Sequence, residues 1–275
     1  MSRQTMNPAP ALHVAIRAAR RAGQIALQQF DRPEKLEIHE KAPHDLVTSA
    51  DLAVEKELMD QLSRGYPQYG FLTEESGSHR PHAEFQWIID PIDGTTNFVR
   101  GIPHFAISIA LARRGEVVAG VVHDPFKDET FTAEKGGGAF FNERRIRVSG
   151  QERLSHALLG TGFPFRHRSV MPSYLKAFGQ VMENVSEVRR AGSAALDLAY
   201  VAAGRFDGFW EMRLAPWDIA AGQLLVTEAG GYVCSVTGEK DYMKSGDIVA
   251  ATPGIHEKLL HLLQGAGLHQ APKRG

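Results

Sequence analysis

Two aspartates that follow an apolar run carry the strongest chemical signal in this chain. Residues 87–97 read Trp-Ile-Ile-Asp-Pro-Ile-Asp-Gly-Thr-Thr-Asn, so Asp93 lies three residues after Asp90. Carboxylates this close repel each other, and a hard divalent cation between them relieves the repulsion. Mg²⁺ takes oxygen ligands from carboxylates, backbone carbonyls and phosphate, so this spacing is compatible with a magnesium site.

The residues after Asp93 suit a bound anion. Gly94 lets the backbone approach a ligand closely, and Thr95 and Thr96 offer amide and hydroxyl donors where a helical turn would present its positive end. The same Asp-x-x-Asp-Gly pattern is also common in turns, where the aspartates cap and the glycine supplies a positive φ. On its own, the segment leaves metal binding and a structural turn both open.

Three further acidic segments lie where a strand is expected to end or a helix to begin. Glu74 and Glu75 follow the expected strand 71–73. Asp51 and Asp218 each lie at the start of an expected helix. Surface glutamates and aspartates that stabilise helix N-termini would explain each segment separately. Taken together they favour a functional site, because sheet-based folds gather such residues at strand ends, where one cleft can collect all four segments.

The periodicity of apolar residues predicts the elements that position these side chains. Residues 11–30 and 49–65 have helical spacing. Residues 85–89, 104–112 and 117–123 are typical of strands, and the last two are expected to pair as a hairpin. The first of these strands delivers the aspartate pair.

The pattern changes near Gly150, after which short strands and helices alternate. We therefore expect two lobes that share one interface. Residues 1–150 would form an N-terminal α+β lobe with most of the acidic segments, and residues 151–275 would form a C-terminal α/β lobe with Asp218.

The overall composition excludes several classes of protein. The 31 Lys and Arg residues against 32 Asp and Glu residues give a formal charge of -1, so no global field recruits nucleic acid or an anionic membrane. No stretch approaches the ~18 apolar residues of a membrane span, and the first residues lack a signal-peptide core. The single cysteine, Cys234, lies in an apolar run and suggests a reducing, cytoplasmic setting.

The four acidic segments, in this order, resemble those of the inositol monophosphatases. The segments are Asp-Leu-Val-Thr-x-x-Asp from residue 45, Glu-Glu-Ser-Gly from residue 74, Trp-Ile-Ile-Asp-Pro-Ile-Asp-Gly-Thr-Thr-Asn-Phe from residue 87, and Pro-Trp-Asp from residue 216. The resemblance covers about residues 11–263, and residues 190–198, Arg-Ala-Gly-Ser-Ala-Ala-Leu-Asp-Leu, are similar to the bacterial SuhB-type branch. It implies a mixed α+β fold of the α/β class, a layered αβαβα sandwich in two lobes with the site between them.

The resemblance also implies roles for individual residues. Oxygens from five residues would bind two or three Mg²⁺ ions: Glu74, Asp90, the backbone carbonyl of Ile92, Asp93 and Asp218. Asp90 would bridge two ions, and Glu75 would be a neighbour without a metal contact. The implied catalytic residues are Asp51, Glu74 and Thr95, of which Asp51 and Thr95 would orient the attacking water.

The implied substrate contacts form a second group: Ile92, Asp93, Gly94, Thr95, Arg189, Gly192, Ser193, Ala194, Glu211 and Asp218. Within it, the amides of Gly94 and Thr95 would hold the phosphate, and Glu211 would bind substrate hydroxyls. One departure affects this group, because Arg213 stands where relatives usually have glycine and its bulk and charge would alter the leaving-group pocket.

The implied reaction is Mg²⁺-dependent hydrolysis of a small phosphate monoester, first of all inositol monophosphate, by an activated water without a covalent intermediate. Sugar, polyol and histidinol phosphates are alternative substrates, and a homodimer and lithium inhibition are also implied. A route through an aspartyl phosphate would need Asp-x-Asp spacing, which Asp90 and Asp93 do not have. SuhB-type relatives also act in transcription complexes, so the basic loop 165–168 is either a contact for a protein or RNA partner or a solvated loop.

Overall fold

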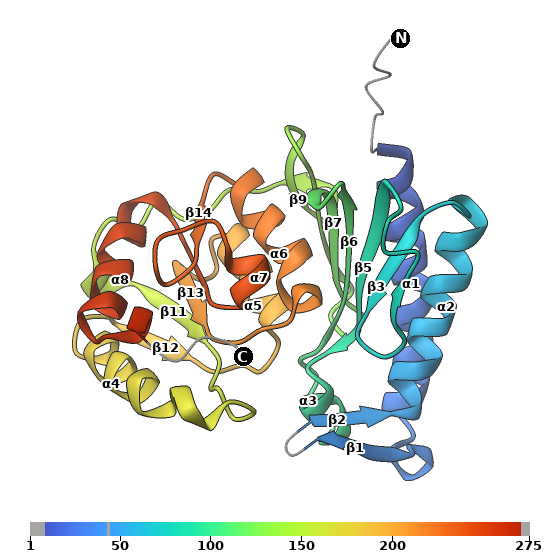
Figure 1. Cartoon of the computed structure of the whole chain (residues 1–275), viewed down its shortest axis with the longest axis horizontal. Coiled ribbons are helices and arrows are strands. Elements are labelled where there is room, and N and C mark those ends of the chain that lie inside the picture. Colours follow the sequence, from blue (N-terminus) through green and yellow to red (C-terminus); the bar gives the residue numbers. More distant parts are fainter. Residues whose placement is uncertain (1–8, 43–44, 271–275) are drawn as a thin grey trace.

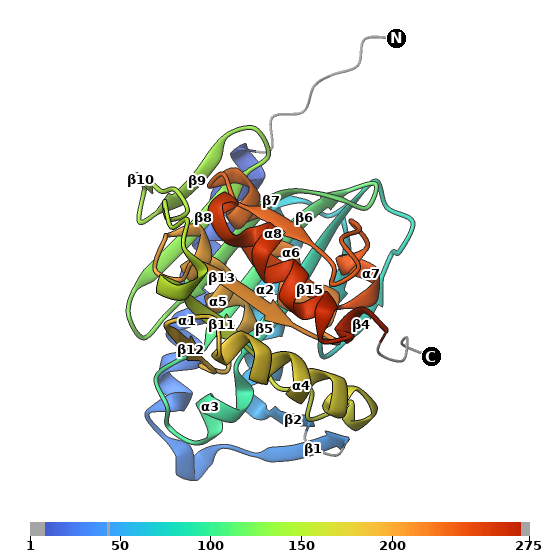
Figure 2. The same cartoon turned by 90° about the vertical axis from the view of Figure 1, so that its left-hand side faces the viewer.

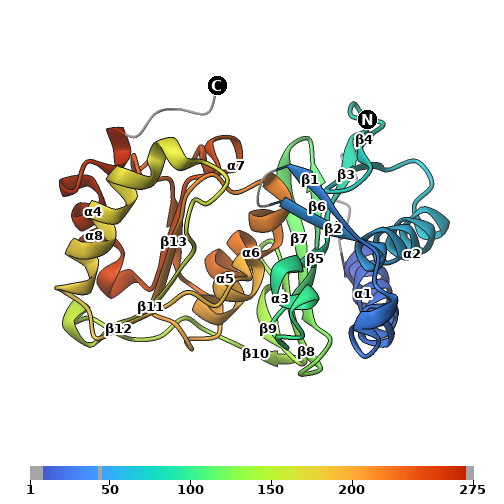
Figure 3. The ribbon, with the colours of Figure 1, turned by 90° about the horizontal axis from the view of Figure 1, so that it is seen from below.

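The computed structural model describes residues 9–42 and 45–270, which form five stacked layers. Figure 1 and Figure 3 show the order across the molecule: two helices, a large sheet, two helices, a smaller sheet and two outer helices. This arrangement confirms the predicted αβαβα sandwich. In the described part of the chain, no helix is both long and apolar enough to cross a membrane.

Helices α1 (Ala9–Phe30) and α2 (Ser49–Gly65) cover the outer face of the large sheet (Figure 1). The buried stripe of α1 consists of small residues, which let the helix approach the strands closely: Ala11, Ala15, Ala18, Ala19, Ala22, Gly23 and Ala26. A methyl group at Gly23 would lie 3.0 Å from the imidazole of His123. Helix α2 begins as expected, because the Thr48 hydroxyl accepts hydrogen bonds from the first free amides.

The large sheet has the order β10-β9-β8-β7-β6-β5-β3-β4. Its strands are β3 (Gly70–Thr73), β4 (Gly77–His79), β5 (Phe85–Asp93), β6 (Ala106–Arg113), β7 (Glu116–Asp124), β8 (Glu129–Glu134), β9 (Gly138–Phe141) and β10 (Arg144–Arg145). Strands β3 and β5 are parallel, and Thr73 aligns with Ile89. The next residues, Glu74 and Asp90, therefore lie side by side at the point where β3 ends.

Strand β5 continues to Asp93, four residues beyond the predicted end. Asp90 pairs with Ser108 and Asp93 pairs with Ala106, so β5 has one extra residue opposite β6 between these two pairs. Without this bulge, residues three apart in a strand would point to opposite faces. The bulge places both carboxylates on the same face, toward the middle helices.

The middle and outer layers come from the second half of the chain. Helices α5 (Ala194–Ala202) and α6 (Pro216–Glu228) lie between the sheets, and α4 (Met171–Met182) and α8 (Pro253–Gly265) cover the smaller sheet, as Figure 2 shows from that side. The smaller sheet has the order β12-β11-β13-β15-β14. Its strands are β11 (Leu158–Thr161), β12 (Glu187–Arg189), β13 (Gly208–Glu211), β14 (Tyr232–Cys234) and β15 (Ile248–Ala251).

Several short elements complete the fold. They are the hairpin β1 (Ile38–Ala42) and β2 (Asp45–Thr48), helices α3 (Thr95–Val99) and α7 (Tyr242–Ser245), and the 3-10 helices η1 (Pro33–Lys35), η2 (Leu154–His156), η3 (Arg168–Val170) and η4 (Leu268–Gln270). The hairpin lies beside α3 at one end of the large sheet (Figure 1). Gly150 lies between the last strand of the large sheet and the first strand of the smaller one. A division into lobes at this residue stays a prediction.

Candidate active site

An acidic cluster forms where the large sheet meets helix α6. Asp90 and Asp93 come from the end of β5, and Asp218 comes from the first turn of α6. Each offers a carboxylate oxygen, and these three atoms lie within 4.8 Å of one another. The hydroxyl of Ser108 on β6 donates to the carbonyl of Trp217 at 3.2 Å, which joins the start of α6 to the sheet. The fold thus brings together residues more than 120 positions apart in the sequence.

Asp90 has the surroundings of a metal ligand. It is only 2% exposed, and among the described residues its Oδ1 has no hydrogen-bond partner. Buried polar atoms are normally paired, so an unpaired carboxylate oxygen in the interior calls for a ligand. A hard cation would satisfy all three groups at once. A donor set made of carboxylates alone suits Mg²⁺ better than zinc, so these residues fit the predicted metal.

The electrostatics of the cluster favour a cation in the same way. Burial raises the pKa of Asp93 to about 6 and that of Asp218 to about 8, and it holds the pKa of Asp90 well above its usual range. The negative charge of Glu74 adds to the increase at each of the three. A bound divalent ion would reverse this effect and favour the ionised carboxylates.

Asp93 and Asp218 each have one carboxylate oxygen that accepts hydrogen bonds from the protein. The Ser193 hydroxyl donates to Asp93 Oδ2 at 2.5 Å, and the Ala195 amide donates to the same oxygen at 2.7 Å. The Ala215 amide donates to Asp218 Oδ2 at 2.7 Å. These bonds fix the orientation of both side chains before any ligand binds. They also show how the start of α5 and the start of α6 contribute to the site.

Glu74 lies outside the group of three but close enough to act on it through its charge. Its Oε1 accepts a hydrogen bond from Lys41 Nζ at 3.1 Å, and the same ammonium group lies 2.8 Å from Glu75 Oε1. Burial raises the pKa of Glu75 to about 7. Lys41 therefore offsets part of the negative charge at this edge of the site. The role of Glu74 as a metal ligand stays a prediction.

The turn that carries Glu74 is fixed by a buried residue of α2. Glu55 accepts hydrogen bonds from the amides of Glu75 and Ser76, both at 2.9 Å, and from the Ser76 hydroxyl at 2.5 Å. Its carboxylate is 3% exposed and is thus paired inside the protein. The sequence analysis missed this residue, although a glutamate on the same helical face as Leu58 and Leu62 is a detectable signal.

Asp51 uses its two oxygens differently. Oδ2 accepts from the amide of Thr48 at 2.8 Å and from its hydroxyl at 2.6 Å, in a reciprocal capping box at the start of α2. Oδ1 lies 3.5 Å from the Thr95 hydroxyl, which also donates to the carbonyl of Ile92 at 3.1 Å. Burial raises the pKa of Asp51 to about 6. Capping, one of the two explanations left open by the sequence, is therefore present, and Asp51 also faces Thr95.

Gly94 sits at the start of α3, in a conformation that other residues rarely adopt. Its φ is 100°, and a Cβ there would lie 3.2 Å from the carbonyl oxygens of Gly192 and His104. The tight packing brings the Gly94 turn against the segment that precedes α5. The start of α3 and the predicted substrate contact Gly192 therefore lie next to each other.

Glu211 lies at the end of β13 in the smaller sheet. Its carboxyl group fills the space beside Gly162, where a Cβ would lie 2.0 Å from it. Burial, followed by the charges of Asp218 and Asp93, raises the pKa of Glu211 to about 8. The guanidinium groups of Arg190 and Arg166 act in the opposite direction.

The comparisons with known proteins agree with this geometry. Residues 7–268 match the model of the inositol monophosphatase family. The chain belongs to the inositol monophosphatase family. It is 48% identical to an inositol-1-monophosphatase of Mesorhizobium japonicum, across 90% of this chain and 94% of that protein. It is 46% identical to the Nus factor SuhB of Escherichia coli K12, across 91% and 94% of the two chains.

A solved structure shows the same fold. The suhB protein of Bartonella henselae is 46% identical and superimposes with a TM-score of 0.90, covering 93% of this chain and 98% of that one. Membership in the inositol monophosphatase family, together with these relatives, makes the protein a phosphatase.

The charge of Arg190 reaches the acidic site of this phosphatase, where it opposes the increase in the pKa of Glu211. Arg189, on the edge strand β12, forms an ion pair with Glu187 at 3.0 Å. A contact between Arg189 and the substrate stays a prediction. The Arg190 guanidinium packs over the rings of Phe163 and Phe165, with centroid distances of 6.0 and 5.5 Å. The sequence offered one signal for Arg190, since it opens the segment that resembles the SuhB-type branch.

Arg213 adopts a left-handed conformation with φ of 67°, which explains why glycine suits this position. Its amide donates to Asp247 Oδ1 at 3.0 Å, and its Nε lies 3.9 Å from the same oxygen. The side chain is 5% exposed. The guanidinium group of Arg213 is thus directed toward Asp247. An effect of Arg213 on the leaving-group pocket stays a prediction.

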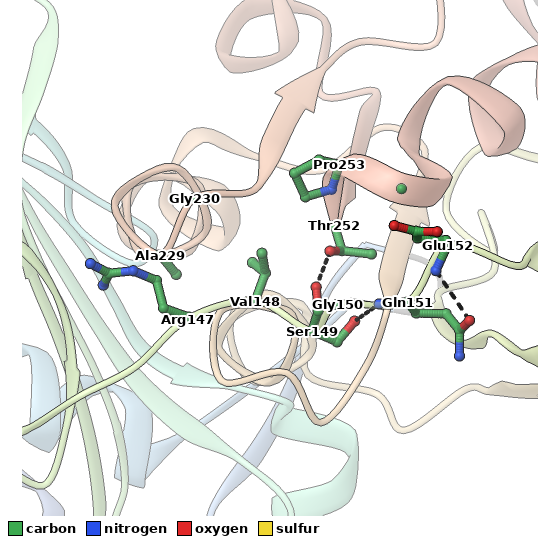
Figure 4. A pocket seen from close by; sticks show the side chains of 11 residues that line it. Arg147, Val148, Ser149, Gly150, Gln151, Glu152, Ala229, Gly230, Thr252 and Pro253 are labelled. Carbon is green, nitrogen blue, oxygen red and sulfur yellow. Dashed lines mark hydrogen bonds between the residues drawn. The ribbon is translucent and has the colours of Figure 1, made fainter.

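A separate cavity of about 360 Å³ lies beside the linking segment 147–152, as Figure 4 shows. Residues 229–230 and 252–254 complete its lining, and the Thr252 hydroxyl donates to the carbonyl of Ser149 within it. It shares no residue with the acidic cluster. The cavity and the acidic cluster are therefore two separate features of the molecule.

Proposed function

We propose that this phosphatase hydrolyses a small phosphate monoester, first of all inositol monophosphate, with Mg²⁺ and a water activated without a covalent intermediate. The observation that carries the proposal is the unpaired, buried Oδ1 of Asp90 beside Asp93 and Asp218. Oxygens of five residues would hold two or three Mg²⁺ ions: Glu74, Asp90, the Ile92 carbonyl, Asp93 and Asp218. Bound ions would lower the pKa of a water ligand and neutralise charge on the phosphate and on the leaving oxygen.

Asp51 and Thr95 would orient the attacking water. The Thr95 hydroxyl is held between the Ile92 carbonyl and Asp51 Oδ1, so its oxygen has a fixed position near the cluster. Because burial raises the pKa of Asp51 to about 6, this carboxyl can take up a proton near neutral pH. Glu74, which stands at the same edge of the sheet as Asp90, would support this step through its charge.

Two groups of residues would bind the substrate. The amides of Gly94 and Thr95 would hold the phosphate at the start of α3. Glu211 would accept hydrogen bonds from hydroxyls of the leaving group, with the backbone of Gly192, Ser193 and Ala194 on the same side. A leaving group with several hydroxyls suits a buried carboxyl together with a polar backbone segment, which supports a polyol over an apolar alcohol.

A covalent route through Asp93 has less support. The aspartyl-phosphate route uses two aspartates spaced Asp-x-Asp, whereas Asp90 and Asp93 are spaced Asp-x-x-Asp. In this proposal both aspartates of the pair bind metal ions, and neither forms a bond to phosphorus. Trapping of an acid-stable phosphoenzyme would overturn the direct attack of water.

The experiment that tests the proposal is a titration of Mg²⁺ against a panel of phosphate monoesters. The panel would contain inositol 1-phosphate, a sugar phosphate, histidinol phosphate and p-nitrophenyl phosphate. We expect activity only with the metal and the largest kcat/KM for inositol phosphate. Equal turnover of all substrates would reject the inositol assignment, and activity without divalent ions would reject the metal mechanism. Lithium and gel filtration would test the expected inhibition and the expected homodimer.

A second function is favoured by one comparison. A relative of 46% identity is a Nus factor, so we propose a contact with a transcription complex through the basic loop 165–168 as an additional role. Phe165 in this loop is 48% exposed, and Arg190 packs over its ring, so an apolar and a basic side chain lie together beside the loop. A pulldown with Asp93→Asn separates the two roles. Binding that persists while hydrolysis is lost would support the second role, and absence of binding by the unmodified protein would reject it.

A further inference from the structure

Asn97 joins the two ends of the candidate site through a single carboxamide. It lies in α3, two residues after Thr95 in the predicted phosphate-binding turn, and is 7% exposed. Its Nδ2 donates to the carbonyl of His104 at 2.8 Å and to the carbonyl of Ala191 at 2.9 Å. Ala191 is 94 residues away in the sequence and precedes α5. One side chain therefore uses both of its amide hydrogens on two separate backbone segments.

The backbone around this carboxamide is packed without spare room. A Cβ on Gly94 would lie 3.2 Å from the Gly192 carbonyl oxygen, and a Cβ on Gly192 would lie 3.0 Å from Asn97 Nδ2. The Gly94 turn, the Asn97 side chain and the Gly192 backbone are thus in direct contact. A small rotation of the carboxamide would displace the segment 191–194, because no empty space absorbs the movement.

We propose that Asn97 is a positioning residue that sets the segment 191–194 against the phosphate-binding turn and thereby sets how the leaving group of the substrate is held. The inference rests on the proposed function, which places the phosphate at Gly94 and the polyol at residues 192–194. Asn97 itself does not touch the acidic cluster through any hydrogen bond described for it; its partners are His104 and Ala191. Its effect therefore falls on the leaving group and not on metal binding.

Loss of the carboxamide leaves two backbone carbonyls without their donor, and a buried acceptor without a partner is costly. The Ala191 carbonyl would turn to find another donor, and the next residues, Gly192 to Ala194, would move with it. Misplacement of a substrate by about 1 Å can lower a rate by up to ~100-fold. A substrate whose leaving group makes no contact with this segment escapes most of that loss.

The test compares two substrates in the magnesium-loaded enzyme, with Asn97→Ala and the milder Asn97→Ser, which keeps one hydroxyl donor. For Asn97→Ala we expect kcat/KM for inositol 1-phosphate to fall about tenfold to 100-fold more than kcat/KM for p-nitrophenyl phosphate, mostly through KM. Asn97→Ser should give a smaller change in the same ratio. Asn184→Ala is the matched control, because the exposed Asn184 follows α4 and its Nδ2 also donates to a backbone carbonyl, that of Gln180 at 2.8 Å.

An equal loss for both substrates, or no loss in either, would overturn the positioning role. Amide hydrogen exchange gives a second measurement that does not depend on the substrate. Exchange in residues 191–195 should accelerate in both Asn97 variants, while the core of α6 stays unchanged. Acceleration spread over the whole chain would mean a general loss of stability and would also overturn the inference. If the unmodified enzyme hydrolyses neither substrate, the proposed function fails, and the exchange measurement still decides the role of Asn97.

Discussion

Replacing Asp93 with asparagine should stabilise the metal-free enzyme at pH 8 and abolish its stabilisation by Mg²⁺. Burial raises the pKa of Asp93 from 3.8 to about 6, so the folded state favours the protonated carboxyl. The contribution of this group to stability is fully present below pH 4 and is lost as the pH rises through 6. At pH 8 the ionised carboxylate therefore destabilises the metal-free fold, and a neutral side chain of the same shape avoids this cost.

The magnitude follows from the pKa values. One pKa unit corresponds to about 1.4 kcal/mol, so the change from 3.8 to about 6 costs ~3 kcal/mol of unfolding free energy above pH 6. Asparagine keeps an oxygen that accepts from Ser193 and Ala195, although bonds to a neutral acceptor are weaker than bonds to a carboxylate. We expect a net gain of ~2 kcal/mol, which is ~4–8 °C in Tm for a protein of this size.

The assay is thermal unfolding followed by circular dichroism in EDTA at pH 4 and pH 8, and again at pH 8 with Mg²⁺. The variant should melt above the unmodified enzyme in EDTA at pH 8, the gap should close at pH 4, and Mg²⁺ should reverse the order. Asp60→Asn is the control, since Asp60 is an exposed aspartate paired with Lys56 on α2. A variant that melts below the unmodified enzyme in EDTA at pH 8 would refute the reasoning.

Three further substitutions probe other parts of the site. At pH 9, where a Glu211 carboxyl with a pKa of about 8 is ionised, Glu211→Gln should raise KM for inositol 1-phosphate about tenfold and leave KM for p-nitrophenyl phosphate unchanged, because a neutral amide accepts weaker hydrogen bonds from hydroxyls. Steady-state kinetics in which both KM values changed together would contradict this. Glu55→Gln should lower the free energy of unfolding by ~2 kcal/mol and weaken Mg²⁺ binding, since the amides of Glu75 and Ser76 lose a charged acceptor. Urea unfolding measures the first effect and calorimetric titration of Mg²⁺ the second, and unchanged values would reject the role of this turn. Gly94→Ala should lower kcat by at least ~100-fold while the chain stays folded. The φ of Gly94 is 100°, and a methyl group there would lie 3.2 Å from the carbonyl oxygens of Gly192 and His104, so the turn has to shift. Near-normal activity would show that the turn can relax and would contradict this prediction.

The fold and the acidic cluster were accessible from the sequence because each depends on local patterns that survive in the structure. Apolar periodicity predicted α1 and α2, and the aspartate pair after an apolar run marked the end of β5. The family resemblance supplied the layered arrangement. It also supplied Asp218, which spacing alone could not have joined to Asp90.

Other features depend on pairing between distant segments, which leaves little trace in one sequence. The bulge that turns Asp90 and Asp93 to the same face is set by the register with β6, and periodicity predicted the end of that strand at Ile89. The same limit explains why Asn97 drew no attention. Its chemistry comes from the carbonyl of Ala191, and nothing near Asn97 in the sequence indicates that partner.

Arg189 and Arg190 show a further limit. Adjacent residues of a strand alternate in direction, so a choice between two neighbouring arginines needs the strand's register. The structure pairs Arg189 with Glu187 and places the charge of Arg190 where it acts on Glu211.

The central claim is that carboxylates from both halves of the chain hold divalent ions. Crystals grown with Mn²⁺ in place of Mg²⁺ would test it directly through anomalous scattering, with activity measured in the same metal. The account predicts strong peaks within coordination distance of Asp90, Asp93 and Asp218, and loss of at least one peak in Asp218→Asn. An active manganese enzyme whose anomalous peaks lie away from these three residues would contradict it.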